Sequence, residues 1–469
     1  MDAPRMKRYR LCDLLYDGEH EEAFADKLAE PKKSAGGDGL TWLELDYPRI
    51  IVDVSTNLLV GETPVISYED PELNDTLREI LDRSRFAATI VEVAQAAAKR
   101  GDAVMVATWT DAGVVIEPKP AYSYFPEQHP DNCRCILSEQ LAWARDWGSK
   151  RVLRVDRYLP GLIHREAYLL SKADKVGRRL TGHDLSDVLG GEPELVGTGL
   201  LDRNTLVHVP NQRSDHEYFG RSDLGGGLPS LFEELNWRIS QISRILDKHA
   251  DPKMFGPSLG GPASSKTGVI DLRQVSYIEI GKDSPIPQYL VWDAQLLQAI
   301  EQYNRVVDEI LRHSETAAVL AGKIQGARFD SARAYRIQLA PTLAKNSRKR
   351  THLDPAIKEI CRIVVAMQRG LDYAAVPAPS VKWRDGLPKD TAEASQTENN
   401  RIASKTSSRL SAIRRLDDCD EQTALAEMAR IEAEQSTFGP VEMPATIPDP
   451  GSTDTQTPET PVSEDQPVA

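Results

Sequence analysis

Two segments between residues 225 and 314 carry apolar residues three and four positions apart, which is the spacing of a helix that buries one face. Pro229, together with Ser230 and Glu233 in a capping-box arrangement, predicts the start of the first helix. We predict helices over 225–249 and 294–314 that pack as an antiparallel pair. Their apolar stripes contain Leu231, Leu235, Ile239, Ile242 and Leu246 in the first helix and Ile300, Tyr303, Val307 and Ile310 in the second.

The segments that follow each helix differ from it in composition. The insert at 250–293 is rich in glycine and contains two strand candidates, so a small β unit is expected between the helices. A loop of small residues and glycine occupies 315–328, and helical spacing resumes at 329–350. Pro341 interrupts this third helix and is expected to kink it.

The sign of the charge changes in the loop and the third helix. The whole chain has a formal net charge of −14, whereas residues 321–350 contain eight cations and a single acid, Asp330. The cations are Lys323, Arg328, Arg333, Arg336, Lys345, Arg348, Lys349 and Arg350. Such a run either forms a solvated face, pairs with acids of a neighbouring subunit, or contacts the phosphates of DNA. Within the loop, Lys323, Gln325 and Arg328 are the candidate DNA contacts, because a few phosphate contacts guide a duplex without gripping it.

The chain before this region is predicted to be a mixed α+β unit. Residues 1–40 are expected to form a loosely ordered arm with one short helical candidate at 19–30. Helices are then predicted at 74–83 and 86–100, and Gly101 supplies the stop signal of the second. The strand candidates whose spacing and turns are typical of an antiparallel meander are 103–109, 113–118, 136–147, 151–158 and 163–170, and 206–210 is one more strand candidate.

The chain after the basic run is predicted to be mostly helical. Asp354 and Pro355 form an N-cap followed by proline, which predicts the start of a further helix. A strand is expected at 380–383, and two polar helices are expected over about 390–415 and 420–434. Residues 436–469 are rich in proline and acids and contain no Lys or Arg, which is the composition of a disordered tail.

No motif for catalysis or for a cofactor emerges. Residues 260–267 read GGPASSKT, but a phosphate-binding P-loop needs glycine immediately before the lysine, where Ser265 stands. Cys133 and Cys135 have no second pair, so ordinary thiols are favoured over a zinc site. An enzyme, a cofactor and a bound metal are therefore not expected.

The cellular compartment is inferred from the cysteine spacing and from the lack of a signal peptide or a membrane-spanning segment. The five cysteines are scattered, which suits a reducing compartment. The N-terminus has no apolar segment of the kind found in signal peptides, and no apolar run approaches the roughly 18 residues of a membrane span. An intracellular protein without a membrane partner is expected.

Five motifs occur in a collinear order that resembles a known family. They are PRIIVD at 48–53 with GETPV at 61–65, GRSDL at 220–224, FDSARA at 329–334 and LPKD at 387–390. In this order they resemble the portal proteins of tailed bacteriophages, the SPP1-type group of head–tail connectors. The resemblance covers about residues 45–435.

This resemblance implies a portal fold whose copies form a ring. Its parts would be an N-terminal arm at 1–40, a wing at 41–224, stem helices at 225–249 and 294–314, a clip at 250–293, a tunnel loop at 315–328, a long kinked helix with a following helix and a wing return strand at 329–388, crown helices at 389–435 and a tail at 436–469.

The resemblance also implies a function and partners. Twelve copies would surround a channel at the unique capsid vertex, through which double-stranded DNA is packaged and ejected. The implied partners are further copies of the chain, DNA, the terminase large subunit, a head–tail adaptor, and the major capsid and scaffolding proteins. The ring would assemble in the cytoplasm of a bacterial host and reside in the virion.

Two other classes of protein are open at this point. A packaging-associated enzyme, such as a terminase-like ATPase or nuclease, would need a lysine preceded by glycine and clustered carboxylates. A monomeric structural adaptor would have to bury both helical stripes against its own body.

Overall fold

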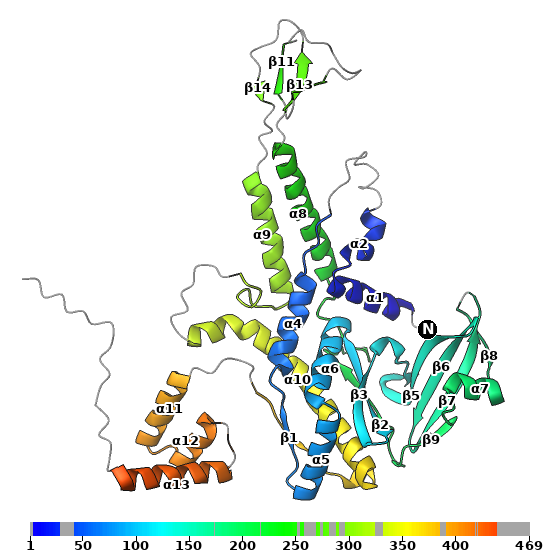
Figure 1. The fold of residues 1–469 in the computed structure, drawn as a ribbon, viewed down its shortest axis with the longest axis vertical. Helices are drawn as coiled ribbons and strands as arrows, with labels where there is room; N and C mark the ends of the chain where they lie inside the picture. The colour runs from blue at the N-terminus through cyan, green and yellow to red at the C-terminus, as the bar shows by residue number, and fades with distance from the viewer. Residues whose placement is uncertain are drawn as a thin grey trace, which may run out of the picture. The chain divides into compact units, whose positions relative to one another are not determined.

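In a computed structural model the chain forms two compact units, Met1–Leu387 and Pro388–Ala469. The structure describes residues 3–28, 42–172, 174–215, 217–250, 254–257, 269–272, 275–280, 288–289, 296–323, 332–384, 391–417, 419 and 421–438. Helices and mostly antiparallel sheets are combined in the first unit, so the expected α+β class is confirmed (Figure 1).

The N-terminal region is packed rather than loose. It contains α1 (Ala3–Asp17) and α2 (His20–Ala23), and it is followed by α4 (Tyr47–Val60). Leu15 is fully buried, and the guanidinium of Arg5 lies 4.1 Å from the ring centroid of Phe219 and donates to the carbonyl of Tyr124 at 2.8 Å. The expected loosely ordered arm is therefore wrong for residues 3–28. The sequence pattern hides this packing because a cation can be buried against aromatic faces that lie far away in sequence.

A three-stranded sheet in the order β10-β2-β3 forms the centre of the first unit. Its strands are β2 (Asp102–Thr110), β3 (Gly113–Lys119) and β10 (Leu206–Pro210), and α5 (Pro71–Arg83) and α6 (Phe86–Arg100) contribute to the core beside it. Gly101 ends α6 at a φ of 100°, as its sequence predicts. A side chain at Gly101 would meet the carbonyl oxygen of Gly220 at 2.6 Å, so the segment after β10 lies directly against this turn.

A second, six-stranded sheet confirms the predicted meander for its last three strands, whereas the first two, β2 and β3, belong to the three-stranded sheet. It consists of β4 (Glu127–His129), β5 (Asn132–Trp147), β6 (Lys150–Leu159), β7 (Leu162–Leu170) and β8 (Val176–Arg179), and β9 (Leu195–Gly197) also pairs with β7. The short helix α7 (Gly182–Leu189) packs against β6 and β7, and one turn of 3-10 helix, Ala121–Ser123, precedes β4.

The two predicted helices are present as α8 (Leu228–Ala250) and α9 (Leu296–His313), which lie side by side (Figure 1). Between them a four-stranded sheet has the order β12-β13-β11-β14, with strands Val269–Leu272, Val275–Ile280, Met254–Pro257 and Gln288–Tyr289. The predicted capping box is wrong, because α8 begins two residues before Ser230. The hydroxyl of Ser230 instead donates to the carbonyl of Gly227 at 2.8 Å.

The basic run opens a single long helix, α10 (Ala332–Arg369), with Pro341 and Pro355 inside it. The predicted new helix start at Asp354 is therefore wrong. A proline inside a helix costs about 3 kcal/mol or more, and burial of the apolar face that contains Ile357 and Ile360 offsets this cost. After α10, a 3-10 turn at Tyr373–Ala375 leads to β15 (Ser380–Lys382). This strand pairs with β1 (Val65–Ser67), as expected for the returning strand.

The second unit contains three helices, α11 (Thr391–Ala403), α12 (Arg409–Leu416) and α13 (Glu421–Phe438). The predicted single helix over 390–415 is thus two helices, because Ser408 caps a new start by accepting a hydrogen bond from the amide of Ser411. Glu398 joins α11 to α12 by accepting from Arg415 at 2.7 Å. The predicted disordered tail lies, from residue 439 onward, outside the described residues.

Candidate functional site

The α8–α9 pair is packed tightly at one end and is exposed at the other. At the end nearest α1, Leu235 and Ile310 are fully buried and Val307 nearly so, in a cluster that also contains Leu15 and Phe232. Leu231 and Tyr303 pack against this cluster and are partly buried. Toward the β11–β14 segment Ile239 is half-buried, although Ile242 is still buried. The sequence-predicted stripe is thus only partly covered by the described residues of this chain.

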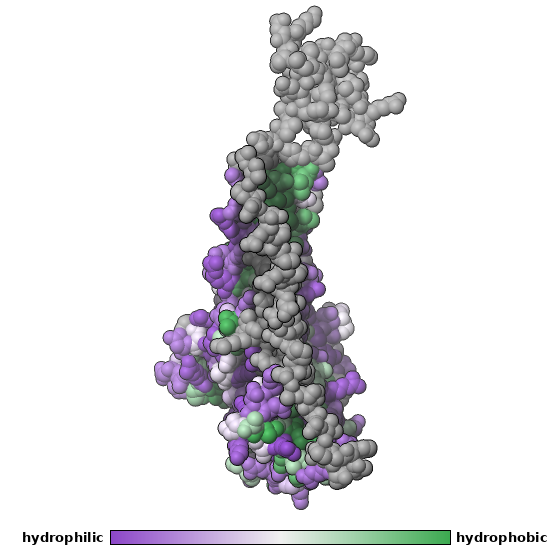
Figure 2. Space-filling view, turned by 90° about the vertical axis from the view of Figure 1, so that its left-hand side faces the viewer, coloured by the Kyte–Doolittle hydropathy of each residue, from purple (hydrophilic) through white to green (hydrophobic). Residues whose placement is uncertain are grey.

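The far end of the pair leaves apolar side chains in solvent. Leu246 is 48% exposed, Ile300 is 40% exposed and Leu297 is 83% exposed. In the space-filling view, hydrophobic residues gather near this end of the pair (Figure 2). Single exposed apolar residues are common, but several on one end of one helical pair are typical of an interaction surface.

At the opposite end, the segment that leads into α8 is fixed by hydrogen bonds to α6. The backbone amide of Asp223 donates to the carbonyl of Ala98 at 2.9 Å, and the hydroxyl of Ser222 donates to the carbonyl of Lys99 at 2.6 Å. The Ser222 hydroxyl also accepts from the amide of Leu224 at 2.9 Å. This segment is the GRSDL motif, and its bonds turn the Asp223 carboxylate toward α10.

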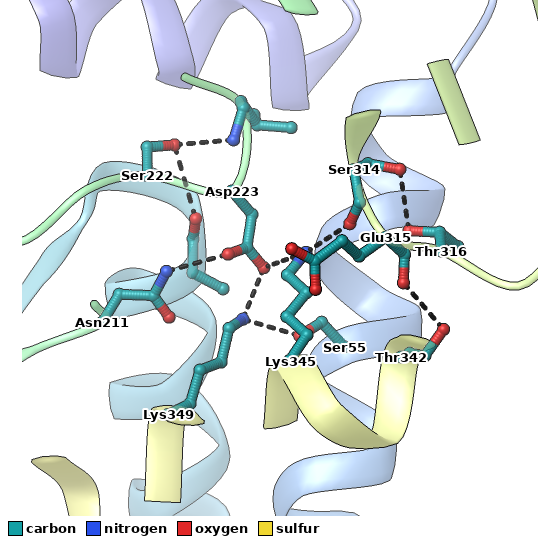
Figure 3. A network of polar contacts seen from close by, with 12 residues as sticks. Ser55, Asn211, Ser222, Asp223, Ser314, Glu315, Thr316, Thr342, Lys345 and Lys349 are labelled. Atoms are coloured by element: carbon teal, nitrogen blue, oxygen red, sulfur yellow. Dashed lines mark hydrogen bonds and ion pairs between the residues drawn. The ribbon is translucent and has the colours of Figure 1, made fainter. Parts of the chain in front are cut away.

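Asp223 lies between two lysines in the interior (Figure 3). Its Oδ2 atom is 3.0 Å from the ammonium of Lys345 and forms a shorter ion pair with Lys349, while its Oδ1 atom accepts from the amide of Asn211 at 2.8 Å. The three charged side chains are 1%, 5% and 2% exposed. Two cations therefore share one carboxylate out of contact with water.

The cluster connects segments far apart in the sequence. Lys349 donates to the hydroxyl of Ser55 in α4 at 2.6 Å, and Lys345 donates to the carbonyl of Ser314 at 3.0 Å. Thr342 donates to the carbonyl of Glu315 at 2.9 Å and accepts from the amide of Ala317 at 2.8 Å. The start of the loop that follows α9 is thus held by α10 through polar contacts (Figure 3).

Because two buried lysines share one carboxylate, the pKa values of Asp223 and Lys349 are shifted. Burial alone would raise the pKa of Asp223, but the two ammonium groups outweigh it and lower this pKa to about 2. Burial, assisted by repulsion from Lys345, lowers the pKa of Lys349 from 10.5 to about 8, although Asp223 acts in the opposite direction. Asp223 is therefore ionised at neutral pH. The burial of a second cation beside it appears as the lowered pKa of Lys349.

The structure separates the cations that the sequence groups together. Lys345 and Lys349 are interior residues, so the expectation that they belong to a cationic surface is wrong. Arg348 pairs with Glu315 at the surface. Arg350 donates to the carbonyl of Arg384 at 2.7 Å.

In the loop, Lys323 is 22% exposed and pairs with Asp308 of α9. Arg336 is exposed in α10, and the side chain of Arg333 is not described. Gln325 and Arg328 lie outside the described residues. The predicted loop and helix cations are therefore not brought together into one described site.

Sequence reasoning missed Asp223 as the centre of this cluster. Asp223 and Lys349 are 126 residues apart, and neither position alone signals the other. A usable signal is the spacing of Thr342, Lys345, Asn346 and Lys349 on one face of α10, all of which are buried.

The described residues form neither a metal centre nor a membrane span. Across that part of the chain, no three His, Cys, Asp or Glu side chains are grouped so that they could hold a metal ion. None of the helices there is long and apolar enough to cross a membrane.

Comparison with known proteins gives distant structural matches. No family model matches the chain, and no curated protein does. A chain from the neck of an empty gene transfer agent particle, computed with C6 symmetry, is 10% identical with a TM-score of 0.48, covering 81% of this chain and 91% of that one. A chain from the neck of the native particle, computed with C12 symmetry, is 11% identical with a TM-score of 0.43, covering 79% and 89%. A chain from the virion of the native particle is 11% identical with a TM-score of 0.44, covering 83% and 98%.

Replacing Asp223 by Asn should lower the free energy of unfolding by about 3–5 kcal/mol, because two buried ammonium groups would lose their counter-charge. The matched control is Glu315→Gln, which removes a carboxylate from the exposed pair with Arg348 and should cost about 1 kcal/mol or less. Urea denaturation followed by tryptophan fluorescence measures both changes. Equal small decreases in the two variants would contradict the buried cluster.

The cluster also predicts a pH dependence above neutrality. Between about pH 8 and pH 10.5 the unfolded chain holds a proton on Lys349 that the folded chain has released, so this residue makes stability rise with pH. Lys345→Met removes the competing cation and should return the pKa of Lys349 toward its ordinary value. The rise in the free energy of unfolding over this range should therefore be smaller in Lys345→Met than in the parent protein, and equal rises would contradict the shared carboxylate.

Proposed function

We propose that this chain is a structural subunit of a portal ring, through whose channel double-stranded DNA enters and leaves a viral capsid. The observation that carries the proposal is the α8–α9 pair, at whose far end Leu246, Leu297 and Ile300 are exposed and uncovered by the described residues of this chain. The collinear GETPV, GRSDL, FDSARA and LPKD motifs support it, because they resemble those of portal proteins, and this resemblance implies that the pair is the stem of a ring.

A ring supplies what one copy lacks. The 23 residues of α8 span about 35 Å at 1.5 Å per residue. When copies stand side by side around an axis, each pair covers the apolar end of the next, and one heterologous interface is used repeatedly until the ring closes. Twelve copies are what the resemblance to portal proteins implies.

The charges suit a channel that passes DNA rather than one that holds it. The chain has a net charge of −14, so a ring of many copies is strongly negative and repels the negatively charged DNA backbone. The loop after α9 places Lys323 next to Asp308, so this cation is partly compensated. We assign to this loop the weak contacts with passing DNA.

The remaining partners follow from the same proposal. The segment between α8 and α9 would meet the terminase large subunit during packaging and a head–tail adaptor afterwards. The α+β unit would meet the major capsid and scaffolding proteins. The chain would have no catalytic step of its own, because DNA is moved by the terminase.

Leu297→Asp should weaken ring formation at least tenfold, because it places a carboxylate in the interface where an apolar side chain is buried. Leu201→Asp is the matched control, since Leu201 is 79% exposed and lies outside the helical pair. Native mass measurement across a concentration series compares the two. If Leu297→Asp forms rings as readily as Leu201→Asp, the far end of the pair is not the interface.

Lys323→Gln should leave the ring assembled and make its association with DNA less dependent on salt. The logarithmic slope should fall by about 0.9 for each phosphate that the loop no longer neutralises. Lys358→Gln is the control, because Lys358 also pairs with a carboxylate, that of Asp354 at 2.7 Å, but lies away from the loop. Binding of a DNA duplex to purified rings between 50 and 200 mM salt, roughly the range over which such contacts weaken, is the measurement. Identical slopes in both variants would contradict the role of the loop.

A further inference from the structure

Strand β10 is an open edge of the three-stranded sheet. Its register with β2 pairs Leu206 with Val106 and His208 with Val104. The amide of Ala107 donates to the carbonyl of Thr205, and the amide of Asn211 donates to the carbonyl of Gly101, so the odd-numbered residues of this strand face β2. In an antiparallel pair the intervening residues point their backbone groups the other way. Leu206 and His208 therefore present theirs at the free edge.

Part of this edge has no partner among the described residues. Asn204 caps one group, because its side-chain oxygen accepts from the amide of Leu206 at 3.3 Å. Pro210 has no amide to offer. The amide and carbonyl of His208 and the carbonyl of Leu206 are left without a partner in the described part of the chain.

The exposed part of His208 is its backbone. Its side chain is only 2% exposed, yet the residue as a whole is half-buried. The imidazole stacks against the rings of both Tyr124 and Tyr218, at centroid distances of 5.1 and 4.8 Å, and its Nε2 atom lies 2.8 Å from the carboxylate of Asp102. These contacts fix the strand edge in place before anything binds to it.

A cavity of about 450 Å³ opens along this edge. Its walls come from β10, from β5 and β6, and from the loop before β10 that contains Asp202, Arg203 and Asn204. This volume falls in the range of sites that hold a small ligand or a few residues of peptide.

The carboxylates that line the cavity have partners, whereas two of its guanidiniums have no carboxylate partner in the described part of the chain. Each lining carboxylate is already engaged: Glu139 accepts from Tyr124 and Asn204, Asp202 accepts from two backbone amides, and Glu359 pairs with Arg203.

Two lining guanidiniums, in contrast, have no carboxylate partner in the described part of the chain. Arg134 donates to the carbonyls of Ser214 and Asp215, and Arg213 lies 5.1 Å from the ring centroid of Tyr218. Within the described part of the chain, the site thus offers unpaired backbone groups beside cations that have no carboxylate partner.

We propose that this edge binds an extended acidic peptide segment of a partner protein, which adds a short strand to β10. The peptide backbone pairs with the amide and carbonyl of His208 and with the carbonyl of Leu206. An acidic side chain of the peptide reaches Arg213, where a charge-assisted bond selects it. None of the residues that line this site belongs to the helical pair, so the peptide proposal can be tested independently of ring formation.

The test uses the full chain and a pool of blocked hexapeptides with randomised sequence and a fixed central glutamate. Peptides enriched on the immobilised protein are resynthesised in three forms: unchanged, with glutamine in place of the glutamate, and with N-methylated backbone amides. We expect the glutamine form to bind at least fivefold more weakly and the N-methylated form not to bind.

Two further readouts locate the binding. Hydrogen exchange of the His208 amide should slow at least tenfold in the complex, whereas the Val207 amide, which faces β2, should not change. Arg213→Gln should remove the preference for glutamate over glutamine. Arg145→Gln, an exposed position on β5 outside the cavity, should retain this preference. Failure to enrich any peptide, equal binding of the N-methylated form, or unchanged exchange at His208 would each overturn the proposal.

Discussion

The salt bridge on which the first unit depends is that of Asp223 with Lys345 and Lys349. A buried carboxylate with two ammonium groups is costly to desolvate, and it is stable only in the geometry that satisfies every donor and acceptor. Asn211, Ser55 and the carbonyl of Ser314 complete that geometry. The contact therefore does what an apolar contact cannot do, since it fixes one arrangement of the start of α8, the end of α9 and the middle of α10.

The two ends of the helical pair differ in how their apolar side chains are covered. Its base is closed within one chain by an apolar cluster and by the polar network around Asp223. Its far end has no such closure, because Leu297 and Ile300 find nothing in the described part of this chain to cover them. A rigid base with an unfinished far end suits a subunit that completes its packing by association. This asymmetry is the structural basis for proposing a ring.

The sequence predicts those parts of the fold that local pattern controls. The spacing of Leu235, Ile239 and Ile242 is enough to predict α8, and the turns between β5, β6 and β7 are enough to predict the meander. Predictions fail where distant residues decide the outcome. Pro355 predicts a helix start, yet α10 continues past it because Ile357 and Ile360 are buried on its apolar face. Lys345 and Lys349 read as surface cations because Asp223, which makes their burial tolerable, lies more than a hundred positions earlier in the sequence.

The most direct test of the portal proposal is an image of the purified, unmodified protein viewed along the axis of its particles, combined with its native mass. We expect closed rings with a central channel wide enough for a DNA duplex and a mass many times that of one chain. A homogeneous population at 52.0 kDa, at concentrations where rings would assemble, would contradict it.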